Sequence, residues 1–368
     1  MEDQSLHLLQ RLLTAAAPSG HESAAAQVWL AAAQSFADRV HVDVYGSAYA
    51  WLQGGSLRVL LSGHIDEIGL MISYIDDAGY IAVDSIGRWD AQVLVGQRVR
   101  ILGRQGELVG VVGKPPIQLL RPEDRGRAST LEELWLDIGA RSREEAEALV
   151  RIGDVAVIDA PLHELLARRI VARSSDNRVG AFVVLEALRL LARERADVTV
   201  AAVATSQEET THAGASMATF HVEPHISLVV DVTFSSDSPG ADKKMLGNVQ
   251  LGGGPVLSRG GANSPVIYDL LVAAAEQQGI PYSVQVTPHD TGTDADVTYL
   301  SRSGVATALI GIPSRYMHSP NTMVDLDDLT YTIKLIVAFV RMLSNNLDLC
   351  PYQVGTPPAI EQPAFAAQ

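Results

Sequence analysis

The stretch Leu61-Ser-Gly-His64-Ile-Asp66-Glu67-Ile-Gly-Leu-Met71 decides how the rest of the chain is interpreted, because the other polar motifs supply partners for it. The apolar residues that lead into it, from Val59 to Leu61, are typical of a buried strand. His64 and Asp66 stand two positions apart, so on an extended backbone their side chains point the same way. A carboxylate beside a histidine is a common arrangement for orienting a metal-binding imidazole. Considered alone, the stretch fits a solvent-exposed polar turn equally well.

The acidic composition narrows the choice of partners. Of 368 residues, 28 are Lys or Arg and 43 are Asp or Glu, which gives a net charge of −15. This balance argues against nucleic acid or an anionic membrane as the main partner, and it leaves carboxylates available for cations. The length and the 47% hydrophobic content indicate two domains, or one large domain with an insertion.

The cysteine content limits the chemistry of any metal site. Cys350 is the single cysteine, so neither an intrachain disulfide nor a thiolate cluster can form, and any metal must bind histidine and carboxylate. The acidic start, Met-Glu-Asp-Gln-Ser, lacks the pattern of a signal peptide. No run approaches the roughly 18 apolar residues of a membrane helix. We therefore expect a soluble, cytoplasmic protein that binds neither membranes nor nucleic acid.

Helices and strands alternate through most of the chain, which predicts an α/β fold with a mixed, largely parallel central sheet flanked by helices. Apolar residues at helical spacing predict the helices, and β-branched runs predict the strands. The expected helices are 6–16, 21–36, 178–193, 265–278 and 329–345, and the expected strands are 40–45, 48–52, 58–61, 198–204, 228–232, 283–286 and 306–310.

The pattern changes between about residues 72 and 163. Here short strands separated by Gly and Pro, interrupted by one helix at 142–150, indicate a small β-barrel or sandwich. We expect residues 72–163 to be a domain inserted into a discontinuous catalytic domain of residues 1–71 and 164–348. The tail, 349–368, is rich in Pro and Ala without periodicity and is expected to be flexible.

Further acids and a histidine lie at predicted strand ends or turns, where α/β sheets place their active sites. Asp176 directly precedes a helix and would ordinarily be an N-cap. Glu208 and Glu209 follow a buried strand. They are either a solvated acidic turn or a buried like-charge pair, and a buried pair needs a cation or a raised pKa. Asp231 lies inside an apolar strand, where an unpaired carboxylate is costly. His318 has the alternative of a capping residue in a loop.

Together these positions supply two histidines and four or five carboxylates to one region of the fold. Oxygen and imidazole ligands without thiolates suit zinc, cobalt or manganese. The set is also large enough for two divalent ions.

The motifs that carry these residues resemble, in order along the chain, those of the tetrahedral (TET) aminopeptidases. This family includes deblocking, glutamyl and leucyl aminopeptidases, and some members have been labelled as endoglucanases. The matching segments are Gly63–Met71, Asp137–Ala146 with Gly153-Asp154, Asp176–Gly180, Gln207–Glu209, Asp231–Thr233, Gly292–Ala295 and Arg315–Pro320.

The resemblance implies a zinc-aminopeptidase-like domain that carries an inserted barrel, and a role for each site residue. It implies that one metal is held by His64, Asp176 and Asp231, and the other by Asp176, Glu209 and His318. Asp66 would orient His64, and Glu208 would be the general base. The same resemblance makes Asp294 and Arg315 candidates for substrate binding, and it implies a homo-oligomer of twelve subunits that acts on peptides.

Two loops depart from the family pattern. After Glu208 and Glu209 the family continues with Val-Gly and a later Arg-Gly-Ala, whereas this chain has Thr210-Thr-His-Ala-Gly-Ala215. The Gly-Thr-Asp motif lies within an unusual segment, His289–Asp296. Both loops border the expected substrate pocket, so the preferred N-terminal residue is left open. We expect His212 to be a loop histidine in solvent rather than an additional pocket residue.

The favoured function is therefore a dimetal aminopeptidase. One alternative keeps the site but changes the substrate to an N-acyl amino acid or another small amide. Another class, a scaffold that has lost catalysis, is disfavoured because every expected ligand and the general base are present. A polysaccharide hydrolase would need two carboxylates without metal and usually an aromatic-lined cleft, but only 5% of the residues are aromatic.

Overall fold

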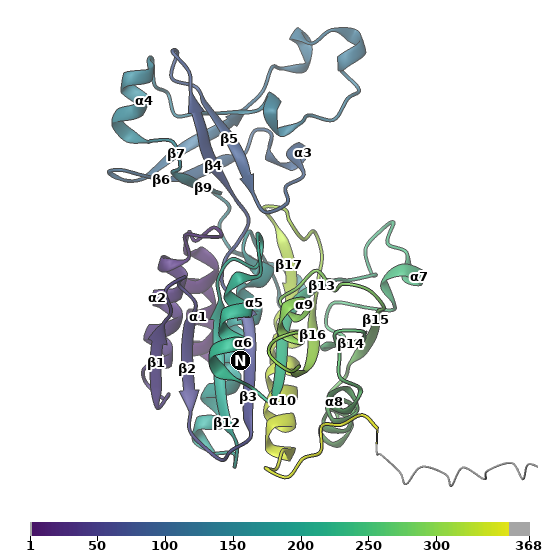
Figure 1. The fold of residues 1–368 in the computed structure, drawn as a ribbon. Coiled ribbons are helices and arrows are strands. Elements are labelled where there is room, and N and C mark those ends of the chain that lie inside the picture. The colour runs from purple at the N-terminus through teal and green to yellow at the C-terminus, as the bar shows by residue number, and fades with distance from the viewer. Residues whose placement is uncertain (1, 353–368) are drawn as a thin grey trace, which may run out of the picture.

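An eight-stranded mixed sheet forms the centre of the larger domain in the computed structural model, which describes residues 2–352 (Figure 1). Its strands are Arg39–Val42 (β1), Ala48–Leu52 (β2), Arg58–His64 (β3), Thr199–Thr205 (β12), Ile226–Phe234 (β13), Val256–Gly260 (β14), Ser283–Thr287 (β15) and Ala306–Ser314 (β16). They lie in the order β1-β2-β12-β3-β13-β16-β14-β15. The pairs β12–β3, β3–β13, β13–β16 and β14–β15 are parallel, and the other three are antiparallel. The predicted mixed, largely parallel sheet is therefore confirmed.

The parallel strands bring distant motifs to one edge of the sheet. His64, the last residue of β3, pairs in register with Thr205, the last residue of β12. Asp231 lies on the adjacent strand β13, opposite Gly311 of β16. Because parallel strands end on the same side, His64, Asp231 and the loop after Thr205 meet there.

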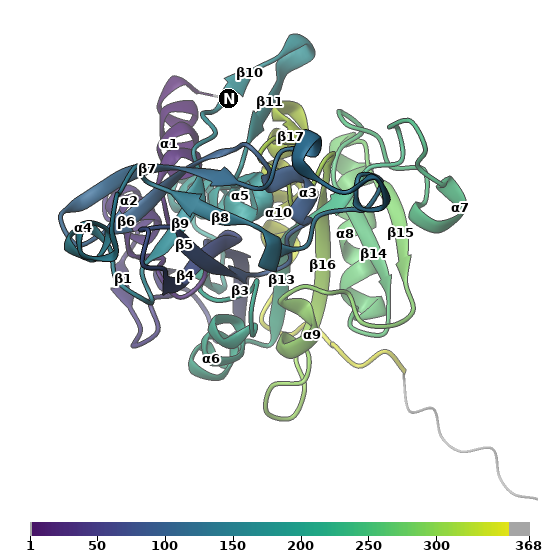
Figure 2. The same ribbon diagram turned by 90° about the horizontal axis from the view of Figure 1, so that it is seen from above.

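Helices cover both faces of this sheet. One face carries Asp3–Thr14 (α1), Ser23–Ala33 (α2), Ser175–Arg193 (α5), Pro265–Gln278 (α8) and Leu326–Met342 (α10); the other carries Ala213–Val222 (α6) and the short helix Ala295–Thr298 (α9) (Figure 2). Alternation along β2 divides the core between the faces. Ala48, Ala50 and Leu52 join the larger apolar cluster, whereas Tyr49 and Trp51 pack beside α6. The sheet is therefore buried on both sides, as expected for parallel strands.

Two glycines let α5 approach β3 closely enough to place its first residues at the site. A Cβ added to Gly63 would lie 2.6 Å from the backbone carbon of Gly180, and one added to Gly180 would lie 2.7 Å from the carbonyl oxygen of Val230. Real Cβ atoms do not approach so closely, so both positions require glycine. Asp176 and Asn177 have non-helical backbone angles, and the regular helix begins at Arg178, as the sequence predicts.

The smaller domain is a closed six-stranded barrel that projects beyond the sheet (Figure 1). Its core is separate and is built on residues such as Ile72, Ile81, Val99 and Leu136. A short helix, Arg143–Leu149 (α4), follows the barrel strand β8. The barrel strands are Gly69–Ile75 (β4), Ile81–Ile86 (β5), Arg98–Gly103 (β6), Gly106–Gly113 (β7), Trp135–Asp137 (β8) and Val155–Ile158 (β9).

The barrel therefore spans residues 69–158, slightly offset from the expected insertion of 72–163. The difference at the start arises because β4, which begins at Gly69, continues the opening stretch directly into the barrel. The difference at the end arises because His163–Glu164 (β10) pairs with Arg169–Ala172 (β11), which in turn pairs with Thr322–Asp325 (β17). This small sheet belongs to the catalytic side of the junction.

Several other elements differ from expectation. β1 ends at Val42 instead of residue 45, because the Asp43 carboxylate accepts the backbone N–H groups of Tyr45 and Ser47 and forms a turn. β14, α6 and β17 were not predicted at all. Residues 353–368, most of the tail expected to be flexible, lie outside the described residues. Among the residues that are described, no helix has both the length and the apolar character needed to cross a membrane.

Candidate active site

His64 is held at the end of β3 with both ring nitrogens facing carboxylates. Its Nδ1 lies 3.3 Å from Asp66 Oδ1, and its Nε2 lies 3.3 Å from Asp176 Oδ1 and 3.7 Å from Asp231 Oδ1. The imidazole is only 1% exposed. One nitrogen therefore faces an orienting acid, and the other faces the centre of the acidic cluster, as the i, i+2 spacing predicts.

Asp66 also fixes the loop that follows β12. Its Oδ1 accepts the backbone N–H of Glu208, and its Oδ2 accepts that of Glu209, each at 3.1 Å. Burial is the largest influence on the pKa of Asp66 and raises it, but the contact with His64, and after it the two backbone N–H bonds, hold this pKa below its usual value. A single buried carboxylate thus aligns His64 and the two adjacent glutamates.

Asp176 connects the two histidines. Its Oδ1 lies 3.3 Å from His64 Nε2, and its Oδ2 lies 3.2 Å from His318 Nε2. His318 Nε2 is also 3.6 Å from Glu209 Oε2. Burial alone would raise the pKa of Asp176, but its contacts with His318 and His64 hold it below the usual range. Asp176 therefore lies between the two histidines and is not an ordinary N-cap.

The expected ligands form two groups that share Asp176. In each group the possible ligand atoms lie within 4.8 Å of one another, and the groups are His64, Asp176 and Asp231, and Asp176, Glu209 and His318. Glu208, the expected general base, stands beside both, with Oε2 3.6 Å from His64 Nε2. The structure thus brings together seven of the nine residues singled out from the sequence.

The cluster has the electrostatics of a cation site. Burial raises the pKa of Glu209 well above its usual value, and the charge of Asp176 raises it further. Burial likewise raises the pKa of Asp231. Glu209 Oε1 is buried and has no hydrogen-bond partner among the described residues. Divalent ions would offset this crowding and complete the coordination of that oxygen, so the donor set fits such ions.

These side chains line a cavity of about 500 Å³, which is large enough for a small ligand. Val232, Phe234 and Met317 add an apolar side to the acidic floor. Arg88, which follows the barrel strand β5, also lines the cavity. The inserted domain therefore contributes directly to the wall of the site.

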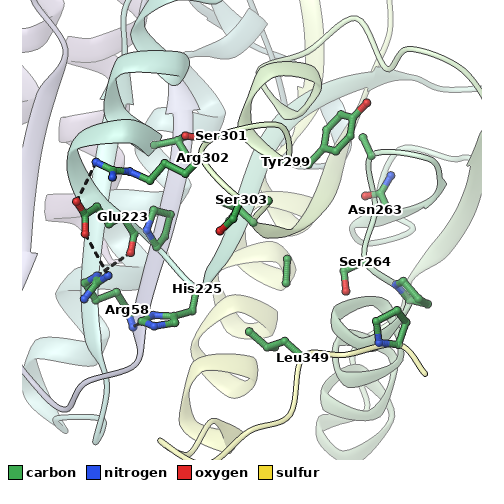
Figure 3. A pocket seen from close by; sticks show the side chains of 18 of the residues that line it. Arg58, Glu223, His225, Asn263, Ser264, Tyr299, Ser301, Arg302, Ser303 and Leu349 are labelled. Carbon is green, nitrogen blue, oxygen red and sulfur yellow. Dashed lines mark hydrogen bonds and ion pairs between the residues drawn. The ribbon is translucent and has the colours of Figure 1, made fainter. Parts of the chain in front are cut away.

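A second cavity, of about 630 Å³, lies at the opposite edge of the sheet near the starts of β3 and β16 (Figure 3). Its charged side chains satisfy one another. Glu223 pairs with Arg302 at 2.8 Å and with Arg58 at 3.6 Å. Because it has no comparable cluster of unsatisfied ligands, this cavity is a weaker candidate for the catalytic centre.

The two candidate substrate-binding residues lie in different surroundings. Asp294 is 1% exposed, and its Oδ2 accepts a hydrogen bond from the Thr205 hydroxyl at 2.6 Å. Arg315 forms a two-bond pair with Asp237, at 2.9 Å from Nε and 2.6 Å from Nη2, and does not line the cavity of the cluster. The role of each in substrate binding stays a prediction.

His212 corrects an expectation. Instead of lying in solvent, it lines the cavity, and its Nδ1 lies 3.3 Å from Glu208 Oε1 and 3.5 Å from Asp294 Oδ1. Its contacts with Asp294 and Glu208 raise its pKa to about 10. In the sequence, the sign of this contact was that His212 follows Glu208 by four residues. That spacing brings the two side chains together only because the chain turns between them.

Four further supporting residues were not identified as such from the sequence. Glu67 is buried and pairs with Arg173 and Arg178 at 2.9 and 2.8 Å. Glu22 lies behind the loop that carries Glu208, and its Oε1 accepts the backbone N–H of Gln207 at 3.1 Å. A signal for Glu67 was available in the sequence. This acid lies in an apolar stretch, Ile65 to Met71, and a buried acid requires a partner.

A buried histidine–carboxylate cluster at the carboxyl edge of an α/β sheet, with a barrel beside it, fits the class of metal-dependent hydrolases. The chain belongs to the M42 glutamyl aminopeptidase family, whose model matches residues 46–335. It is accordingly a peptide hydrolase of the family that the sequence motifs indicate.

Individual relatives agree with this assignment. The lysyl aminopeptidase of Pyrococcus furiosus is 36% identical over 317 residues, which cover 86% of this chain and 90% of that protein. The TET aminopeptidase of Thaumarchaeota archaeon SCGC AB-539-E09 superimposes with a TM-score of 0.90 at 31% identity, covering 93% and 97% of the two chains. The Pyrococcus horikoshii TET1 peptidase, described as assembling into a tetrahedron or a large octahedral shell, has a TM-score of 0.82 at 30% identity, covering 92% and 100%.

Proposed function

We propose that this aminopeptidase removes N-terminal residues from peptides with two divalent ions per subunit, zinc, cobalt or manganese. The observation that carries the proposal is Asp176, whose two oxygens face His64 at 3.3 Å and His318 at 3.2 Å. One ion would be held by His64, Asp176 and Asp231, and the other by Asp176, Glu209 and His318. Two ions that share a carboxylate would supply Lewis-acid activation of a water and of the scissile carbonyl.

Glu208 has the position of a general base in this scheme. Its carboxylate faces the cavity between the two ligand groups, and its backbone is fixed by Asp66. It would take a proton from the attacking water and return it to the leaving amine. Burial raises the pKa of Glu208, which brings it closer to neutral pH, where a carboxylate exchanges protons most effectively.

The acidic cavity also suits the free α-ammonium group of a peptide. Buried carboxylates attract a cationic amine, whereas an N-acylated terminus would bring no charge to offset them. We therefore favour free-amine peptides over N-acyl amino acids as substrates. Asp294 and Arg315 are proposed to influence substrate binding through Thr205 and Asp237, the neighbours to which they are bonded.

The experiment is a panel of aminoacyl anilides assayed beside their N-acetylated counterparts, with metal content measured on the same preparation. We expect hydrolysis of the free-amine compounds and about two equivalents of metal per chain. Hydrolysis restricted to the acetylated compounds would favour a deacylase instead. The spread of rates across the panel also identifies the preferred N-terminal residue.

We further infer assembly into a homo-oligomer of about twelve subunits. The support is that the Pyrococcus horikoshii relative forms tetrahedral or octahedral shells and that a related structure is described as a dodecamer. In such an assembly the barrel, which already contributes Arg88 to the cavity, would help enclose the sites. A confined chamber would admit peptides and exclude folded proteins.

A further inference from the structure

His212 occupies the cavity because of a tight turn after Glu208. The carbonyl oxygen of Gln207 accepts the backbone N–H groups of Thr211 at 3.0 Å and His212 at 2.9 Å. His212 itself adopts a left-handed conformation, with φ of 55°, immediately before α6. The chain therefore turns back and returns the imidazole to the side of Glu208.

Asp294 anchors the far side of this imidazole. It directly precedes α9, which lies beside α6 on the same face of the sheet (Figure 2). Its Oδ2 accepts the hydroxyl hydrogen of Thr205, and its backbone oxygen accepts that of Thr298 at 2.7 Å. Its Oδ1 is buried and has no hydrogen-bond partner among the described residues. The basic group that faces this oxygen is His212 Nδ1, at 3.5 Å.

The imidazole thus stands between a fixed carboxylate and the proposed general base. Glu208 uses its two oxygens differently, with Oε1 3.3 Å from His212 Nδ1 and Oε2 3.6 Å from His64 Nε2. If His212 were absent, the carboxylates of Glu208 and Asp294 would face each other in a buried site without a charge between them. Repulsion would then rotate the more mobile side chain, Glu208, because Asp294 is fixed by Thr205.

We propose that His212, held by Asp294, is a positioning residue that fixes the rotamer of the Glu208 carboxylate for proton transfer. The inference rests on the proposed role of Glu208. It gives a function to one of the two loops that depart from the family pattern, since His212 lies in the segment Thr210–Ala215. Precise placement of a general base is a large part of its catalytic effect, so a small rotation is costly.

The primary test compares His212→Ala with His212→Asn in the metal-loaded protein. Asn retains a side-chain N–H close to the position of Nδ1 and tolerates the left-handed backbone. We expect His212→Ala to lower kcat by about 10- to 100-fold with KM changed less than about threefold. We expect His212→Asn to recover part of that loss, because it restores the N–H donor but not the charge. A rise in KM with unchanged kcat would instead make His212 a substrate contact and overturn the proposal.

Two further measurements separate positioning from other roles. In a Glu208→Gln background, His212→Ala should lower the residual kcat by less than about twofold, because no ionised base is left to position. An undiminished loss in that background would overturn the inference while leaving the role of Glu208 intact. Metal content should stay unchanged in His212→Ala. Loss of one equivalent would make the imidazole a ligand, since Glu208, His212 and Asp294 also present possible ligand atoms within 4.8 Å of one another.

Thr205→Val provides a milder variant if His212→Ala does not fold. It removes only the hydroxyl that anchors Asp294 and preserves the shape of a residue in β12. We expect a smaller loss of kcat, about 3- to 10-fold, with metal content retained. Wild-type kcat in both Thr205→Val and His212→Asn/Thr205→Val would show that the anchor has no part in positioning Glu208.

Discussion

Arg178 Nη2 lies 2.8 Å from Glu67 Oε1, and neither side chain reaches solvent. The same guanidinium donates to the carbonyl oxygens of Ile65 at 3.0 Å, Leu12 at 2.8 Å and Ala17 at 3.1 Å. It therefore ties three parts of the chain together directly behind the site. One part carries His64, another carries Asp176, and the third is the end of α1.

Arg178→Met should destabilise the protein by about 3–5 kcal/mol, because it leaves several buried acceptors and part of the Glu67 charge unpaired. Arg195→Met is the matched control. Arg195 forms a bidentate pair with Asp38 at 2.6 and 2.7 Å, but it is 48% exposed. Its loss should cost at most about 1 kcal/mol. Thermal unfolding of both variants measures the difference, and equal losses would contradict the special role of the buried pair.

Glu208→Gln and Glu209→Gln should differ in metal content. Glu208→Gln should keep its metal and lose about 10²–10⁴-fold in kcat, because only proton transfer is removed. Glu209→Gln should lose affinity for one of the two ions as well, because Glu209 belongs to the group with Asp176 and His318. Elemental analysis beside kinetics tests this. Metal loss in Glu208→Gln alone would mean that the two roles are reversed.

Removal of metal should abolish activity reversibly. Dialysis against a strong chelator is expected to inactivate the protein, and zinc, cobalt or manganese should restore turnover as about two equivalents bind. Magnesium is the control, because it prefers oxygen ligands and would find two imidazoles in this set. Full activity after the chelator, with metal shown to be absent, would rule out the dimetal mechanism.

Glu22→Gln should stabilise the metal-free protein more at pH 8.5 than at pH 5. Burial, and then the charge of Asp66, raises the pKa of Glu22 to about 7 from an ordinary 4.5. When the pKa of an acid is higher in the folded protein than in the unfolded chain, the acid does not reduce the free energy of unfolding at a pH below the unfolded value. The reduction in the free energy of unfolding grows between about pH 4.5 and 7 and then stays constant, at an upper limit of roughly 3 kcal/mol.

The variant keeps the bonds that Glu22 makes. Both Gly20 N–H and Gln207 N–H are donated to the same oxygen, Oε1, which a glutamine also has. The increase in Tm over wild type should therefore be several degrees larger at pH 8.5. A gain that is independent of pH would show that Glu22 ionises normally in the folded protein.

Light scattering should give a particle of about twelve subunits, and replacement of the barrel should reduce it. Leu70 of β4 pairs with Ala156 of β9, so the chain enters and leaves the barrel on adjacent strands. A short Gly/Ser linker can therefore replace residues 70–157 without stretching the catalytic domain. A wild-type monomer at micromolar concentration would refute the assembly, and an intact dodecamer after the replacement would refute the role of the barrel in it.

The residues that the structure brings together at the proposed site could be selected from the sequence more readily than the contacts that support them. His64 could be selected because it follows a predicted buried strand, Asp231 because an acid inside an apolar strand needs a partner, and Asp176 because it precedes a predicted helix and belongs to the same series of motifs. β14 and α6 were missed because Gly-rich and Ala-rich segments carry little periodic signal. The position of His212 depends on a turn and on Asp294, which is far away in the sequence, so no local pattern could reveal it. The cytoplasmic location and the exact domain boundaries remain predictions.

The barrel lies in the sequence between the first proposed ligand and the other four, and His318 comes only after β16. A growing chain therefore holds His64 long before it has Asp176, Asp231 or His318. Neither proposed ion can be fully coordinated until nearly the whole polypeptide has left the ribosome and the sheet has added β13 and β16. Because domains fold as units during synthesis, the barrel can fold before the larger domain, whose sheet needs strands that follow the barrel in the sequence. Each copy of the enzyme therefore stays inactive until its own synthesis is almost complete.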